Sequence, residues 1–208
     1  MKFDTLEKNK RSRGRPKTIG YDATLKIAMH AYWSKGIDAM SVNEICRLAG
    51  VSKPSLYREF GNEDALLSTV IKYYGVELHE NLTALLNRHK TFSENLNGLI
   101  DFASFTRDQS ILPKGCLAAK GFQAFERLGK KSRMELEALS HDSLNIFNQW
   151  VSEFRKEISL GIDWCESQIG EYIFSIFTHG MIMNDQGKNP EKIKRIMSLA
   201  LSPLVIKI

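Results

Sequence analysis

The sequence has few of the features that mark a secreted or membrane-embedded protein. Its 208 residues include only three cysteines, an odd number that does not suggest a disulfide framework. The N-terminus is charged and has no apolar segment of the kind found in signal peptides. The longest nearly apolar stretch, residues 172–183, is interrupted by Ser175, Thr178 and His179 and is too short to cross a bilayer. We therefore expect no membrane helix and a cytoplasmic location.

Patterns for metal binding and catalysis are also scarce. The five histidines show no spacing with cysteines or carboxylates that is typical of metal ligands, so we expect no metal and no cofactor. An enzyme using Cys116 and a histidine as nucleophile and base is conceivable, but no spacing requires it. With 43% hydrophobic residues the chain can bury a proper core, in one domain or two.

Positive charge is concentrated at one end of the chain. Residues 1–60 hold 12 of the 29 Lys and Arg but only 6 of the 24 Asp and Glu, so they carry a net charge of +6 and the remainder carries −1. Six basic residues crowd around Gly14 and Pro16, and the tripeptide Arg13-Gly14-Arg15 is similar to the core of an AT-hook, which inserts into the DNA minor groove. A solvated basic tail remains the alternative. The local concentration of positive charge indicates a polyanionic partner.

Two short helices joined by a tight turn are predicted in the segment that begins at Ser41 and reads SVNEICRLAGVSKPSLYREF. Ser41 and Glu44 fit a capping box at the start of the first helix, and Gly50 fits its end. Ser52 can cap the second helix, whose first turn accepts Pro54 because those N–H groups have no intrahelical partner. One face of the first helix is apolar: Val42, Ile45, Cys46 and Ala49. Such a helix-turn-helix places its second helix in a DNA major groove.

The second helix of this pair divides into two faces. Leu56 and Phe60 lie one turn apart and point inward. On the outward face, Ser55 and Tyr57 can donate to phosphate oxygens, and Arg58 can reach a phosphate or a guanine edge. We predict DNA contacts for ten residues: Arg13, Arg15, Ser41, Val42, Ser52, Lys53, Pro54, Ser55, Tyr57 and Arg58.

The run AGVSKPSLYREF, followed by ALL, closely resembles the TetR family of transcriptional regulators over residues 18 to about 78. The resemblance implies an all-α fold, in which a three-helix head with the helix-turn-helix is joined by a fourth helix to a helical body. Glu59 and Glu63 depart from it, because many members have His and Lys there, and two customary phosphate contacts are not carried over. We expect Glu63 and Asp64 to complement a helix N-terminus instead.

Helical patterns continue to the end of the chain, and no segment shows strand alternation. We divide the chain into a flexible basic arm at 1–17, a DNA-binding domain at 18–78 with the helix-turn-helix at 41–60, and an effector-binding and dimerisation domain at 79–208. The expected helices outside the helix-turn-helix cover residues 22–35, 62–88, 94–108, 116–128, 131–159, 163–185 and 190–203.

The last two helices carry broad apolar stripes. The resemblance implies that these helices meet their symmetry mates in a four-helix dimer interface, and a two-fold dimer would select a palindromic operator. Burial within one chain is the alternative. The residues assigned to the interface are Ile169, Tyr172, Ile173, Ile176 and Met183 in one helix and Ile193, Ile196, Met197 and Ala200 in the other.

The middle of the body is rich in aromatic residues, which can line an apolar cavity or simply fill a core. The resemblance implies that an effector, here a small apolar or aromatic molecule, binds in this region. The candidate contacts are Phe102, Phe105, Cys116, Phe122, Gln123, His141, Phe147 and Trp150.

Together these features predict a dimeric DNA-binding regulator, most simply a repressor that a small molecule releases from its operator. One alternative is a thiol or electrophile sensor acting through Cys116, whose position at a helix start near Lys114 and Lys120 would lower the thiol pKa. Another is an architectural or partner-binding DNA protein with no effector.

Deleting residues 1–17 tests the role of the basic arm. We expect weaker DNA binding and a shallower dependence of the binding constant on salt, by roughly one unit of slope for each phosphate that the protein no longer neutralises. Titrations at several salt concentrations measure this slope, and an unchanged slope would show that the arm does not touch DNA.

Overall fold

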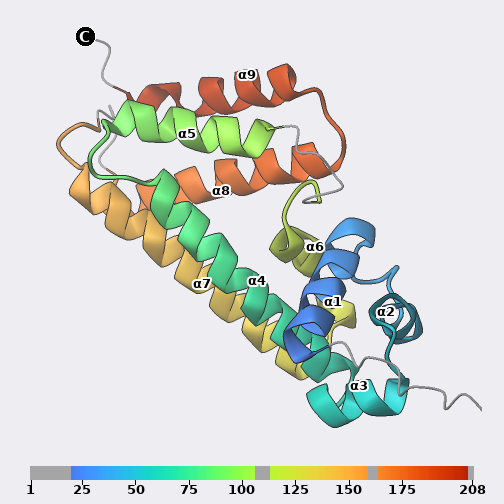
Figure 1. Cartoon of the computed structure of the whole chain (residues 1–208). Coiled ribbons are helices and arrows are strands. Elements are labelled where there is room, and N and C mark those ends of the chain that lie inside the picture. The colour runs from blue at the N-terminus through green and yellow to red at the C-terminus, as the bar shows by residue number, and fades with distance from the viewer. Residues whose placement is uncertain (1–19, 106–112, 159–163, 206–208) are drawn as a thin grey trace, which may run out of the picture.

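The computed structural model describes residues 20–105, 113–158 and 164–205, and these ranges form nine α-helices and two short 3-10 helices (Figure 1). Their only strand-like pairing is an isolated bridge between Ile158 and Val205. None of the described helices has the length and apolar character needed to span a membrane. The all-α fold expected from the sequence is therefore confirmed.

The head consists of α1 (Tyr21–Lys35), α2 (Val42–Ala49) and α3 (Lys53–Phe60). The Ser41 and Ser52 hydroxyls cap the two short helices, accepting hydrogen bonds from the third residue of each. Gly50 ends α2 with φ 63°, a left-handed conformation that glycine adopts without strain. The expected capping box is only half formed, because the Glu44 carboxylate instead pairs with Lys35 at 2.9 Å.

A long fourth helix, α4 (Glu63–Leu85), leaves the head and runs beside α7 (Lys130–Glu153) over most of its length (Figure 1). Leu66 and Val70 on α4 and Leu136 on α7 are fully buried, so one core continues from the head into the space between these helices. The two helices thereby connect the head to the body as a pair.

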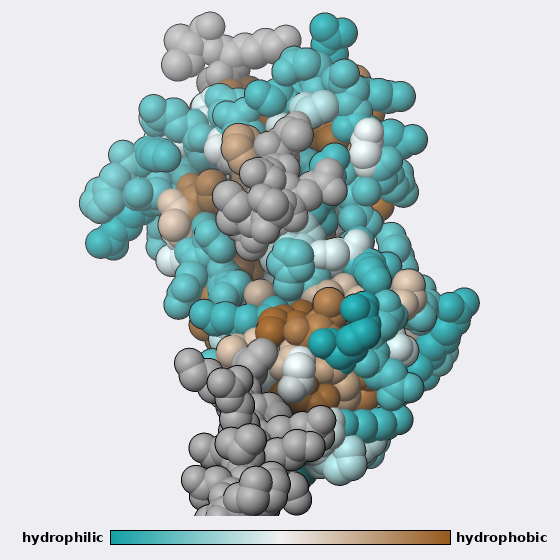
Figure 2. All heavy atoms as spheres, turned by 45° about the vertical axis from the view of Figure 1, so that its right-hand side comes forward, coloured by the Kyte–Doolittle hydropathy of each residue, from teal (hydrophilic) through white to brown (hydrophobic). Residues whose placement is uncertain are grey.

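The body is completed by α5 (Phe92–Ser104), α8 (Glu166–Asp185) and α9 (Pro190–Leu201), which lie roughly side by side in Figure 1. A short helix, α6 (Leu117–Gln123), lies between this group and α1. The 3-10 turns Phe125–Arg127 and Ser202–Leu204 follow α6 and α9. Hydrophilic side chains cover most of the face seen in Figure 2, where apolar ones reach the surface only in restricted areas.

Most of the apolar stripe on α8 and α9 is buried inside the chain, which corrects part of the dimer assignment. Helix α8 packs against α5, α7 and α9, so its apolar residues face its own neighbours. Gly180 allows α9 to approach so closely that an added Cβ would meet the sulfur of Met197. The residues removed from the interface are Ile169, Ile173, Ile193 and Met197, all 0% exposed, and Met183, 6% exposed.

Asp64, in the first turn of α4, fastens the head to the start of α7. Its carboxylate accepts hydrogen bonds from the backbone N–H groups of Lys131 and Ser132 at 3.0 and 2.9 Å and from the Ser132 hydroxyl at 2.6 Å. Gly129 makes room for it, since a Cβ there would collide with the carboxylate. The sequence correctly placed Asp64 at a helix N-terminus, but the structure shows that it also caps α7.

Further polar contacts join the head and the region around α6. Arg127 forms an ion pair with Asp38 at 2.6 Å, and the indole N–H of Trp33 donates to the carbonyl of Lys114 at 3.1 Å. On the other side of α6, Lys120 pairs with Asp185 of α8 at 2.8 Å. These contacts tie the region around α6 and the first turn of α7 to the head.

Replacing Asp64 with Asn tests this connection. We expect a loss of about 1–2 kcal/mol in the free energy of unfolding, because the charged acceptor at the start of α7 disappears. Burial raises the pKa of Asp64, but the hydrogen bonds from Ser132 and Lys131 outweigh it and hold the pKa below its ordinary value of 3.8. The contribution should thus be complete above about pH 4 and vanish as the pH falls through the lowered pKa. Denaturant unfolding across this range measures it, with the exposed Glu137→Gln as control. Equal stability of Asp64→Asn and the wild type would contradict this role.

Candidate functional site

Helix α3 lies at the outer edge of the head, at the end of the molecule away from α5 and α9 (Figure 1). Leu56 and Phe60 are buried in the head core, as predicted, and Tyr21 stacks on the Phe60 ring. The opposite face is open: Lys53, Pro54, Arg58 and Glu59 are exposed, and Ser55 and Tyr57 are partly exposed.

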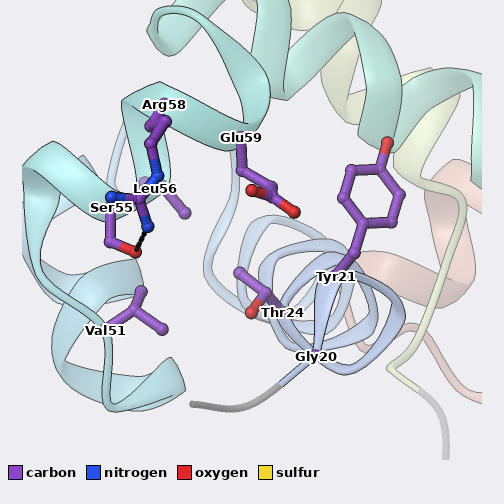
Figure 3. Close-up of a pocket in the computed structure, with 8 residues that line it drawn as sticks. All are labelled: Gly20, Tyr21, Thr24, Val51, Ser55, Leu56, Arg58 and Glu59. Atoms are coloured by element: carbon purple, nitrogen blue, oxygen red, sulfur yellow. Dashed lines mark hydrogen bonds between the residues drawn. The ribbon is translucent and has the colours of Figure 1, made fainter.

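Two contacts within α3 hold its outward side chains in place. Arg58 donates from Nη2 to the Ser55 hydroxyl at 3.1 Å, which Figure 3 shows as a dashed line. The Lys53 ammonium lies 5.4 Å from the centre of the Tyr57 ring, within the range of a cation–π contact. A guanidinium and a phenol that are already oriented lose less freedom on meeting a phosphate or a base edge.

The N-terminus of α1 lies next to this helix. Gly20, Tyr21 and Thr24 line a notch of about 200 Å³ together with Arg58 and Glu59 of α3 (Figure 3). The chain therefore enters α1 beside the outward face of α3. The predicted minor-groove residues Arg13 and Arg15 lie outside the described residues.

The structure gathers most of the remaining DNA-binding candidates on one surface, from Ser52 to Arg58, with exposed Ser41 at the start of α2. Val42 is the exception. Its side chain is 4% exposed and belongs to the head core, so a contact from this side chain to DNA is ruled out. The periodicity of α2 had already placed Val42 on the inner face. A buried inner face and a prearranged polar outer face define a helix-turn-helix DNA-binding module, the reading head of a transcriptional regulator.

Comparison with known proteins agrees with this class. Residues 25–70 match the model of the bacterial regulatory proteins of the tetR family, and this segment contains the helix-turn-helix. The transcriptional repressor ComR of Escherichia coli K12 is 38% identical over 74 residues, 36% of this chain and 35% of ComR. The repressor BdcR of the same strain is 29% identical over 121 residues, 58% of this chain and 61% of BdcR. The matches thus span about a third and about three fifths of these curated relatives.

The fold extends further than these sequence matches. A structure of a cysteine mutant of CifR, a TetR-family regulator complexed with 26-base-pair operator DNA, superimposes with a TM-score of 0.72. It covers 90% of this chain and 98% of CifR at 18% identity. At this identity the likeness shows a shared fold for head and body together.

The body contains an apolar cavity of about 300 Å³ bounded by α4, α6, α7 and α8. Few polar groups reach it, and one of them, the Ser143 hydroxyl, lies 3.1 Å from Nε2 of His79 on α4. Cys116 and Phe122 are the two effector candidates that line this cavity. The other lining residues are Leu78, Leu82, Ala118, Ala119, Leu139, Ser140, Ser143, Phe174, Phe177, Thr178 and Met181.

The remaining effector candidates do not line this cavity. Phe147 and Trp150 are core residues, and Trp150 stacks on Phe92 at 4.8 Å. Phe105 is 63% exposed. His141 and Gln123 are exposed as well, and Phe102 borders a separate cavity of about 60 Å³. Aromatic content alone could not separate core from cavity. Sequence reasoning missed Leu78 and Leu82, although their spacing of one turn on α4 is a helical signal for one wall of the cavity.

Cys116 has the opposite electrostatic setting from the one predicted. Burial raises the pKa of its thiol and outweighs the hydrogen bond that the Tyr74 hydroxyl donates to Sγ at 3.2 Å. Lys120, which was expected to lower this pKa, is paired with Asp185 instead. The thiol is therefore neutral at physiological pH, and the lowered pKa predicted for a sensing thiolate is wrong.

The three cysteines should differ sharply in reactivity. Cys165 is exposed, and the Ser167 hydroxyl and the Gln168 N–H lower its thiol pKa, whereas burial raises the pKa of Cys46. When the protein is treated with iodoacetamide at about pH 7, we expect Cys165 to be alkylated first and Cys116 and Cys46 much later. Mass spectrometry of timed samples measures the order. Tyr74→Phe should slow Cys116 further, because it removes the donor that favours the thiolate. Alkylation of Cys116 before Cys165 would contradict the assigned pKa directions.

Proposed function

We propose that this protein is a homodimeric transcriptional repressor that binds a palindromic operator through α3 and is released when a small apolar effector enters the body cavity. The observation that carries the proposal is the outward face of α3, where Arg58 is oriented by Ser55 and Tyr57 is covered by Lys53. The names of ComR and BdcR as repressors support repression. CifR bound to operator DNA supports the same use of the head. Because its target is chromosomal DNA, the protein is proposed to act in the cytoplasm.

The dimer is proposed to form through the parts of α8 and α9 that the chain does not bury itself. Leu199 is 77% exposed and Ile196 39%, which is unusual for large apolar side chains one turn apart. Tyr172 donates to the carbonyl of Ala200 at 2.6 Å, so these two interface candidates lie side by side on neighbouring helices. Ile176 on α8 is also partly exposed. A two-fold axis here would present two α3 helices to successive major grooves, roughly 34–36 Å apart.

The effector is proposed to be uncharged and largely apolar, because the cavity has apolar walls and the only polar side-chain groups in its lining are hydroxyls and a thiol. A volume of about 300 Å³ suits a small molecule. The existence of this cavity supports an effector-responsive regulator over an architectural DNA protein. An electrophilic effector that reacts with Cys116 is a second candidate, favoured only by the place of that thiol in the cavity wall.

Release from the operator would follow if the effector separates the helices that form the walls of the cavity. Helices α4 and α7 both bound the cavity and both reach the head, where Asp64 holds the first turn of α7. A molecule that separates these helices would turn the head relative to the body. In a dimer such a rotation changes the spacing of the two α3 helices and lowers the affinity for a fixed operator.

Arg58→Ala tests the DNA-binding part of the proposal. On DNA from the region upstream of its own gene we expect about tenfold to hundredfold weaker specific binding, because an oriented guanidinium no longer reaches the operator. Mobility-shift titrations measure the affinity, and circular dichroism confirms that the head stays folded.

The matched control is Arg88→Ala, which removes an exposed arginine in the turn that follows α4. It should bind DNA like the wild type. Equal affinity of Arg58→Ala and Arg88→Ala for the same DNA would overturn the assignment of α3 as the recognition helix.

A further inference from the structure

A second hollow lies at the junction between head and body, separate from the cavity in the body. It is a groove of about 520 Å³ between the loop after α1, the start of α4 and the start of α7. Its volume is sufficient for a small organic ligand. Its apolar lining includes Ile37 and Leu128, and its polar lining includes Tyr32, Asp38, Glu63 and Arg127.

Tyr32 gives this groove an unsatisfied polar group. Its side chain is 1% exposed, and its hydroxyl is buried without a hydrogen-bond partner among the described residues. A buried hydroxyl without a partner costs about 1–3 kcal/mol, so a ligand that supplies one has a specific advantage at this point. Burial and, to a smaller degree, the Glu63 carboxylate and the Tyr57 phenol raise the pKa of Tyr32. Tyr32 and Glu63 both line the groove.

The acidic residues of the groove differ in whether they have a bonding partner within the described part of the protein. Asp38 is paired with Arg127, and Asp64 is occupied by the start of α7. Glu63 makes no hydrogen bond or ion pair with any other described residue. With three carboxylates and one guanidinium, the lining has a net charge of −2. The open position beside Glu63 therefore favours a cation.

The kind of cation follows from the neighbouring groups. No group of three or more His, Cys, Asp and Glu side chains in the described ranges could hold a metal ion. An ammonium group, in contrast, needs one carboxylate and further oxygen acceptors, and the Tyr32 hydroxyl oxygen can accept an N–H from it. The apolar side chains of Ile37 and Leu128 suit a hydrocarbon tail.

We propose that this junction groove binds a small organic ammonium ion, with its charged head between the Glu63 carboxylate and the Tyr32 phenol and its tail on Ile37 and Leu128. The site is distinct from the proposed effector cavity. It would bind a cation, whereas the cavity is proposed to bind an uncharged molecule. Because the groove is built from head and body together, a bound ammonium ion stabilises their packed arrangement.

Three probes of equal length separate charge from hydrophobicity: n-hexylammonium, n-hexanol and hexanoate, each titrated into the full chain by calorimetry. We expect hexylammonium to bind, hexanol to bind at least about tenfold more weakly at this site, and hexanoate not to bind there. Glu63→Gln should weaken hexylammonium binding by about tenfold or more, and Tyr32→Phe by roughly threefold to tenfold. The exposed Glu137→Gln removes the same charge elsewhere and should change nothing.

Binding of hexylammonium that Glu63→Gln and Tyr32→Phe leave unchanged would overturn the proposal, as would no detectable binding to the wild type. Hexanol binding that is insensitive to both variants would report the body cavity instead. Since the readout is ligand affinity and not DNA binding, failure here leaves the proposed regulator untouched, and loss of DNA binding by Arg58→Ala leaves this site untouched.

Discussion

The burial of Leu56 and Phe60 in the head core is the constraint on which the rest of the structure depends. These two side chains, one turn apart on an eight-residue helix, fix the rotation of α3 about its own axis. Once that rotation is set, Arg58 faces outward, and Ser55 and Tyr57 flank the buried face, where Tyr57 also packs against the head core. The short contacts among the outward residues then limit their rotamers, so the surface offered to DNA is prepared before DNA arrives.

The body matters because it holds this surface in a defined place. Helix α4 continues from the head without a break, and Asp64 binds the start of α7 to the same point, so two long helices rather than one carry the head. Cavity and head are thus connected through both walls of the cavity. The neutral thiol of Cys116 and the apolar lining leave the cavity without a charged side chain.

Local chemistry made much of the fold predictable. The capping residues Ser41 and Ser52 and the left-handed Gly50 mark helix ends by interactions only three or four residues long, and the sequence placed these ends correctly. The outward face of α3 was predictable for the same reason. The predicted DNA contact of the Val42 side chain is wrong, because this residue lies on the apolar face of α2 and is 4% exposed.

The periodicity of apolar residues could not predict which elements pack against each other over long distances in the sequence. An apolar stripe shows that a helix buries a face, but not whether its cover is another helix of the chain or a second copy, and α8 proved to be covered by α5, α7 and α9. The same limit applies to the residues predicted to contact an effector. The sequence does not distinguish Phe147, which lies in the core, from Phe122, which lies in the cavity wall. The contact between Asp64 and Ser132 joins residues 68 positions apart, and no local sequence pattern predicts it.

The most direct measurement of the central claim is enrichment of bound sequences from random double-stranded DNA by the purified full chain. The account predicts an inverted repeat whose two halves are centred about one helical turn or somewhat more apart. Absence of any enriched sequence, or enrichment of a single unrepeated half, would contradict it.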